Sequence, residues 1–186
     1  QAMRVYVGKP IINSVNGKRH VMDAVFPLAR KYGGAIVCLT LDEEGIPATV
    51  EARLDIARRI AAEADRYGIH RRDLLFDALT MTVATDPAAA RVTLETVRRL
   101  TQELRVKTVL GVSNVSFGLP RRTVLTSAFL AMAIEKGLSA AIINPLDSGV
   151  RAAFDGACAA LGYDEGFERY LALYAGAQEP TAGIAP

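Results

Sequence analysis

The chain has 186 residues, 51% of them hydrophobic and 23% charged, which is an ordinary composition for a globular domain. Its formal net charge of +2 offers no electrostatic case for nucleic-acid binding. No apolar stretch approaches the roughly 18 residues that span a membrane, and Cys38 and Cys158 form neither a disulfide framework nor a metal motif. The sequence therefore predicts a cytoplasmic protein that binds neither nucleic acid nor membrane.

Five short apolar runs alternate along the chain with longer segments of helical period. In chain order, strands are expected at residues 10–15, 35–41, 74–79, 108–113 and 140–144. Helices are expected after them, at residues 21–32, 47–67, 86–104, 123–136 and 151–161. Because the strand runs are almost wholly apolar, they indicate a parallel sheet covered by helices. The alternation predicts an α/β fold.

Local signals support these helices. In the segment 47–67, apolar residues recur every three or four positions and define one helix face. Asp86 followed by Pro87 is typical of a helix start. Gly68 and Gly137 follow predicted helices and are typical of C-terminal caps.

Polar residues stand where each predicted strand ends. The carboxyl ends of parallel strands meet at one edge of the sheet, where both barrels and open α/β sheets build their sites. A residue of this kind can instead be a turn or helix cap. The shared position favours a binding site made from several of them: Asn13, Asp42, Asp77, Asn114 and Asn144.

Five strands fit two architectures. One is a complete five-stranded, doubly wound open sheet, and the other is the last five units of an eight-stranded barrel, which usually needs about 250 residues. The opening QAMRVYVGKP is typical of a helix end leading into a strand, and AGAQEPTAGIAP is typical of a linker. We therefore expect the domain to occupy residues 1–175 and a linker-like tail to occupy 176–186.

Four segments carry a family resemblance. KPIINSVNG, LLFDALTMTV, VKTVLGVSNVSFGLPRRTVLTSAFLAMAIEKGL and AAIINPLD resemble, in order, the pterin-binding methyltransferases. These include the folate domain of cobalamin-dependent methionine synthase and the methyltetrahydrofolate:corrinoid-protein methyltransferases. The blocks GVSNVSFGLP and INPLD are the specific ones. The resemblance implies a (β/α)8 barrel of the pterin-binding type.

On this resemblance the chain begins just before the fourth barrel strand. The first three strands are then absent, together with an aspartate that the family uses to bind the pterin. Five strands cannot close a barrel, so the open edges are expected to pair with something, for example a second copy of the chain.

The resemblance also implies an activity, the transfer of the N5 methyl group of 5-methyltetrahydrofolate to Co(I) of a corrinoid protein or domain. A linker-like tail favours a methionine-synthase type, in which a cobalamin module often follows. Departure of the amine requires a proton or a strong hydrogen bond at N5, and we expect Asn114 to strengthen its contact there as the bond breaks. Pterin contacts are expected from Asn13, Asp77, Gly111, Ser113, Arg122 and Ile142, with Phe117 beside the site.

Two other functions are compatible with the same pattern. A dihydropteroate synthase shares the barrel, but AAIINPLDSGVR lacks the basic ending that a pyrophosphate site near the last strand would need. A non-catalytic α/β binding module or an inert fragment is the other alternative, and it would show no affinity for folate.

Overall fold

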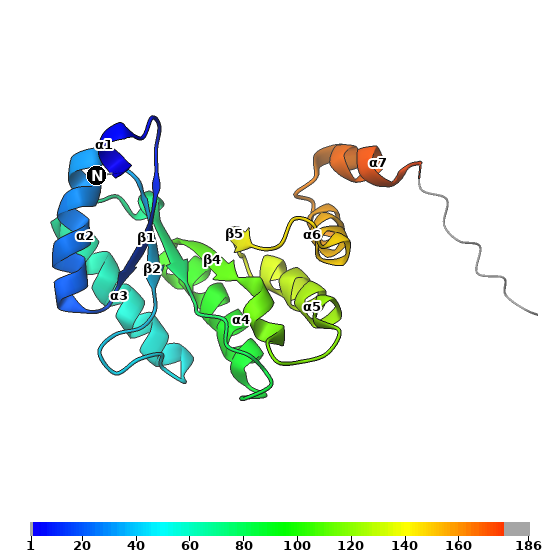
Figure 1. Cartoon of the computed structure of the whole chain (residues 1–186), viewed down its shortest axis with the longest axis horizontal. Helices are drawn as coiled ribbons and strands as arrows, with labels where there is room; N and C mark the ends of the chain where they lie inside the picture. The colour runs from blue at the N-terminus through cyan, green and yellow to red at the C-terminus, as the bar shows by residue number, and fades with distance from the viewer. Residues whose placement is uncertain (1, 177–186) are drawn as a thin grey trace, which may run out of the picture.

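The computed structural model describes residues 2–176 of the chain. Five parallel strands form one sheet in the consecutive order β1-β2-β3-β4-β5 (Figure 1). The strands are β1 (Ile11–Asn16), β2 (Ala35–Leu39), β3 (Leu74–Asp77), β4 (Lys107–Gly111) and β5 (Ala140–Ile142). All five predicted strands are confirmed.

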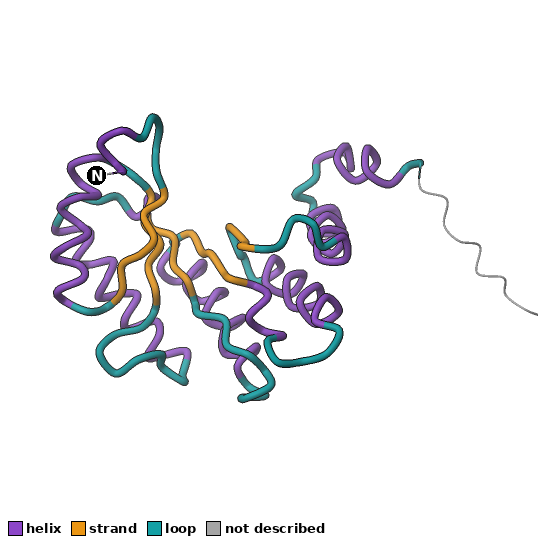
Figure 2. The backbone as a smooth tube through the Cα atoms, in the orientation of Figure 1, coloured by secondary structure: helices purple, strands orange, loops and turns teal. Residues whose placement is uncertain are grey.

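The consecutive strand order decides between the two predicted architectures. A doubly wound sheet reverses its order at a switch point and carries helices on both faces. Here every crossover leads to the next strand, and right-handed crossovers then place the helices on one side. Figure 2 shows the strands side by side with helices ranged around them. The sheet is therefore an open arc of the kind that a (β/α)8 barrel contains.

Six helices of seven residues or more accompany the sheet, preceded by the short helix α1 (Ala2–Val5). The helix α7 (Glu168–Tyr174) was not predicted from the sequence, and it packs on α6 (Ser148–Ala160). The predicted helix 86–104 has two parts: the α-helix α4 (Ala89–Arg99) and a π-helical turn, Leu100–Leu104, that follows it directly. The six are α2 (Arg19–Tyr32), α3 (Val50–Arg66), α4 (Ala89–Arg99), α5 (Arg122–Glu135), α6 (Ser148–Ala160) and α7 (Glu168–Tyr174).

The core lies between the sheet and this helix layer. Alternate strand residues point into it, so that Ile36 pairs with Leu74 and Cys38 with Phe76, all fully buried. Burial raises the pKa of the Cys38 thiol, which makes this cysteine an inert hydrophobe rather than a nucleophile. The sheet face opposite the helices is only partly covered, since Ile11 and Ile142 are exposed there, whereas the apolar strands predicted a sheet covered by helices.

Helix ends follow the predicted cap chemistry in two of three cases. Gly68 and Gly137 have left-handed backbones and end their helices as expected. The expectation for Asp86 is wrong, because α4 begins three residues later. The Asp86 carboxylate accepts a hydrogen bond from the Ala88 N–H at 2.8 Å and so fixes the turn before the helix.

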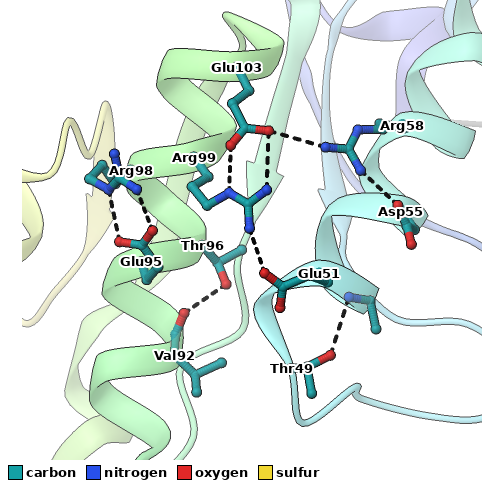
Figure 3. A network of polar contacts seen from close by, with 11 residues as sticks. Thr49, Glu51, Asp55, Arg58, Val92, Glu95, Thr96, Arg98, Arg99 and Glu103 are labelled. Atoms are coloured by element: carbon teal, nitrogen blue, oxygen red, sulfur yellow. Dashed lines mark hydrogen bonds and ion pairs between the residues drawn. The ribbon is translucent and has the colours of Figure 1, made fainter.

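A network of ion pairs joins α3 to the end of α4 (Figure 3). Arg99 contacts Glu51 of α3 at 2.7 Å and Glu103 of its own helix at 2.5 Å. Arg58 of α3 reaches back to Glu103 at 3.1 Å. Exposed pairs contribute about 0–1 kcal/mol each, so the network chiefly fixes how the two helices lie against each other.

Within residues 2–176, no helix has the length and apolar character needed to cross a membrane. The predicted tail, residues 176–186, lies outside the described part of the chain except for Gly176.

Candidate functional site

Four of the predicted site residues share the sheet face that points away from the helices. Asp77, Gly111 and Ile142 each lie between neighbours that pack into the helix-side core, and Asn13 follows Ile12, which packs there too. Strand side chains alternate between faces, so these residues point to the opposite, concave side. They are Asn13, Asp77, Gly111 and Ile142, contributed by β1, β3, β4 and β5.

The strand register places three of these residues near the carboxyl edge. Gly111 pairs directly with Ile142, and Asp77 pairs with Val109, two residues before Gly111. Asn13 pairs with Val37, one pleat deeper than Asp77, or about 6–7 Å toward the amino ends of the strands. Gly111 and Ile142 are therefore level at the carboxyl edge, Asp77, the last residue of β3, lies one pleat below them, and Asn13 lies two pleats below.

Asp77 is the last residue of β3 and is half-buried. Its Oδ1 accepts a hydrogen bond from the Leu79 N–H at 2.8 Å. Burial raises the pKa of the Asp77 carboxyl, and this bond together with the positive charge of Arg53 limits the rise. The site thus holds a partly desolvated carboxylate, which forms stronger hydrogen bonds to a ligand than an exposed one.

The sequence predicted that Asn114 directly follows a strand. In the structure it lies instead in the 3-10 turn Val112–Ser116 that follows β4. Val112 and Val115 are fully buried and anchor the turn, because side chains three residues apart in a 3-10 helix share a face. Ser113 and Asn114, on the other side, are exposed. No local signal in the sequence distinguished this turn from the end of a strand.

Gly111 makes room for the Asn114 side chain. A Cβ at Gly111 would lie 3.3 Å from Asn114 Nδ2, closer than ordinary contact. The backbone of Gly111, with φ −76° and ψ 84°, is accessible to other residues. The glycine is therefore needed for space rather than for its conformational freedom, and the Asn114 amide fills that space.

Arg122, the first residue of α5, holds this turn from behind. Its Nη2 donates to the Ser113 carbonyl at 2.7 Å, and its Nε donates to Ser116 Oγ at 3.1 Å. The guanidinium also lies 5.7 Å from the centre of the Phe117 ring. Arg122 was expected to contact the pterin, and in this structure its contacts support the loop.

The loop after β3 is bonded to the Asn114 turn. The Val83 N–H donates to the Val115 carbonyl at 3.0 Å, and Thr82 Oγ1 donates to the Phe117 carbonyl at 2.6 Å. The two segments that carry Asp77 and Asn114 are thereby fixed to each other. Sequence reasoning missed this link because it joins loop backbones that no periodic pattern marks.

The two other polar strand-end residues have local roles. Asp42 contacts Arg59 at 2.6 Å, an ion pair that lowers the pKa of this carboxyl. Asn144 accepts a hydrogen bond from the Leu146 N–H and forms a turn after β5. A cavity of about 240 Å³ beside this turn is lined by Ser113, Arg122, Thr123, Thr126, Ile143, Asn144, Asp147 and Val150. A larger hollow of about 500 Å³ lies at the amino ends of β4 and β5, away from these residues.

Within the described part of the chain, no cluster of three His, Cys, Asp or Glu side chains could hold a metal ion. The arrangement is a barrel-type sheet arc with a carboxylate and an amide near its carboxyl edge, the edge at which (β/α)8 barrel proteins build their sites. The family model described as pterin binding enzyme matches residues 1–144. The chain belongs to the pterin-binding enzyme family.

Curated relatives agree with this membership. The chain is 36% identical over 150 residues to a methionine synthase from Mycobacterium leprae, a match that covers 74% of this chain and 12% of that protein. It is 26% identical over 165 residues to a methylcorrinoid:tetrahydrofolate methyltransferase from Eubacterium limosum, covering 86% of this chain and 60% of the other. The chain thus spans only part of the relatives it matches.

Solved structures show the same fold. A Yersinia pestis DHPS with a pterine-sulfa conjugate superposes with a TM-score of 0.65 at 15% identity, covering 83% of this chain and 62% of that one. Dihydropteroate synthase from Stenotrophomonas maltophilia gives a TM-score of 0.59 at 17% identity, covering 95% and 65%.

Proposed function

We propose that this chain is the pterin-binding part of a cytoplasmic methyltransferase that moves the N5 methyl group of 5-methyltetrahydrofolate to the Co(I) centre of a corrinoid protein or domain. The single observation that carries the proposal is the half-buried Asp77 carboxylate at the carboxyl edge of the sheet. It stands beside the Asn114 turn in a chain whose sequence relatives are folate and corrinoid methyltransferases.

The pterin ring presents an amine and a ring N–H side by side, and a carboxylate can accept both. Asp77 fits this requirement, since each of its oxygens has two lone pairs and, among residues 2–176, only the Leu79 N–H donates to the carboxylate, at Oδ1. Asn13 offers both a donor and an acceptor deeper on the same face. Ile142, 60% exposed beside Gly111, supplies an apolar surface for the flat ring.

Methyl transfer breaks the N5–CH3 bond, and its electron pair stays on nitrogen. The corrinoid, when bound by its partner, supplies the nucleophilic Co(I) that takes the methyl group. As that bond breaks, N5 takes up a proton from solvent, and the exposed Asn114 amide oxygen can accept a hydrogen bond from the N5–H that forms. An interaction that strengthens as the bond breaks raises the rate.

A homodimer is also part of the proposal, because the edge strand β1 and the segment before it expose apolar side chains. Val7 is 96% exposed and Ile11 is 65% exposed. An unpaired edge of this kind is a template for pairing with another strand.

A dihydropteroate synthase activity is not supported by the likeness to those enzymes, which at 15% and 17% identity shows the fold alone. The cavity of about 240 Å³ beside the turn after β5 is lined by both Arg122 and Asp147. A hydrogen bond from Thr123 lowers the pKa of Asp147, so this carboxyl is charged at neutral pH. Its negative charge disfavours a pyrophosphate there.

The proposal is tested by calorimetric titration of the chain with 5-methyltetrahydrofolate. Replacing Asp77 with Asn removes a charged acceptor, and the expected loss is about 1.5–3 kcal/mol, or roughly 10- to 150-fold in Kd. Asp42→Asn is the matched control, since that carboxylate at the same edge is engaged by Arg59. It is expected to leave the Kd unchanged.

If the chain shows no affinity for the folate, the proposal fails for this chain, and the same titration on an N-terminally extended chain separates a scaffold from a pocket that needs the preceding barrel strands. Equal Kd values for wild type and Asp77→Asn would remove Asp77 from the site. Where binding is found, the loss of Co(I) cobalamin absorbance on mixing with 5-methyltetrahydrofolate measures the transfer step itself.

A further inference from the structure

A buried arginine stands behind the candidate carboxylate. Arg53 lies in α3 within its apolar stripe and is only 3% exposed. In residues 2–176 it has no carboxylate within ion-pair distance. A buried cation carries a large desolvation cost, which an apolar side chain of similar size would avoid. Packing alone therefore does not explain why a guanidinium is buried here.

The hydrogen bonds of Arg53 show which segments the guanidinium connects. Nη1 donates to the Ala78 carbonyl at 2.6 Å and to the Leu79 carbonyl at 3.2 Å, the two residues directly after Asp77. Nε donates to the Pro47 carbonyl at 2.9 Å, in the loop before α3. One guanidinium thus ties the loop after β3 to the loop after β2.

The bonded loop has an unfavourable backbone at one residue. Leu79 has a φ of 61°, in the left-handed region that residues other than glycine rarely occupy. This conformation accompanies the Leu79 N–H bond to Asp77 Oδ1. Thr93 Oγ1 of α4 also donates to the Leu79 carbonyl, at 3.3 Å. Arg53 and Thr93 together hold the strained residue in place.

We infer that Arg53 is a positioning residue for Asp77: by fixing the Ala78 and Leu79 carbonyls it aims the carboxylate at the pterin edge. This inference rests on the proposed function for its ligand. It predicts that Arg53 acts on binding through Asp77 and not through the general stability of the domain.

The charges around this pair are few. Arg53 is the charged group that acts on the Asp77 carboxyl, and Asp77 and Asp86 are those that act on Arg53. Lys107 of β4 pairs with Leu75, one pleat away from Asp77. Loss of the guanidinium charge is therefore expected to raise the pKa of Asp77 further, and Asp77 would need a higher pH to bind the ligand.

The test combines Arg53→Met and Arg53→Lys with Asp77→Asn. Titration with 5-methyltetrahydrofolate should show about tenfold weaker binding for Arg53→Met and little further loss when Asp77→Asn is already present, as for residues that share one network. Arg53→Lys keeps the charge but cannot bridge both loops. It should weaken binding while leaving the Asp77 titration close to wild type.

Asp77 is followed in the ligand-free chain by carbon-detected NMR of its carboxyl, and circular dichroism shows which variants fold. An upward shift of the Asp77 titration in Arg53→Met supports the inference, and an unchanged or lowered one overturns it. Should Arg53→Met not fold, a wild-type Kd for Arg53→Lys overturns it instead. Full additivity of the binding losses also overturns it. If the wild type does not bind folate, the proposed function fails, while the NMR titration still decides the role of Arg53.

Discussion

A single methyl group added at Gly111 should separate the chemistry of the site from the stability of the fold. In Gly111→Ala the new Cβ would lie 3.3 Å from Asn114 Nδ2, so one of the two must move by a few tenths of an ångström. The Asn114 side chain is the mobile partner, because it is exposed whereas the strand backbone is held in the sheet. The substitution therefore displaces the amide by a small and defined amount.

The expected magnitudes follow from that displacement. A 1 Å misplacement can reduce a rate about 100-fold, so a few tenths of an ångström predicts roughly a three- to tenfold loss in methyl transfer. The backbone at Gly111 suits alanine, so the free energy of unfolding should stay within about 1 kcal/mol of wild type. Asn114→Ala should lower the rate further, since it removes the amide.

Methyl transfer from 5-methyltetrahydrofolate to Co(I) cobalamin gives the rate, and urea unfolding gives the stability. Gly156→Ala is the matched control, because a Cβ there meets open space on α6. It should add about 0.5–1 kcal/mol of helix stability and leave the rate alone. A wild-type methyl-transfer rate in Gly111→Ala would refute the reasoning. An equal loss of rate in Gly111→Ala and Gly156→Ala would refute it too.

Two further predictions concern stability. Since burial raises the pKa of Asp77 above its unfolded value, its ionised form opposes folding as the pH rises through the folded pKa. Asp77→Asn should therefore be more stable than wild type in urea near neutral pH, and the gain should vanish below about pH 3.9; a less stable variant at neutral pH contradicts this. In Gly149→Ala the Cβ would lie 2.5 Å from Thr123 Cγ2, so the α5–α6 contact should weaken by about 1–3 kcal/mol, measured likewise against Gly156→Ala. Equal stability of these two alanine variants would show that the helices adjust freely.

Local pattern was enough to find the strands and most of the helices. Apolar runs and helical periodicity depend on neighbouring residues, which is why the five strands were placed within two residues at every end. The errors fall where polar residues follow a strand, as at Ser113, because a 3-10 turn and a strand end have the same local sequence. The short helix α7 was missed for a related reason, since its apolar residues merge with the linker-like tail.

The sequence by itself determined the α/β class, the family and the identity of Asp77 and Asn114 as site candidates, because these depend on residue type and order along the chain. The tertiary structure alone decided the consecutive strand order, the deeper position of Asn13 and the partners of Arg53. Such features arise from contacts between segments that are distant in sequence. A buried arginine becomes informative only when the carbonyls that receive its hydrogen bonds are known.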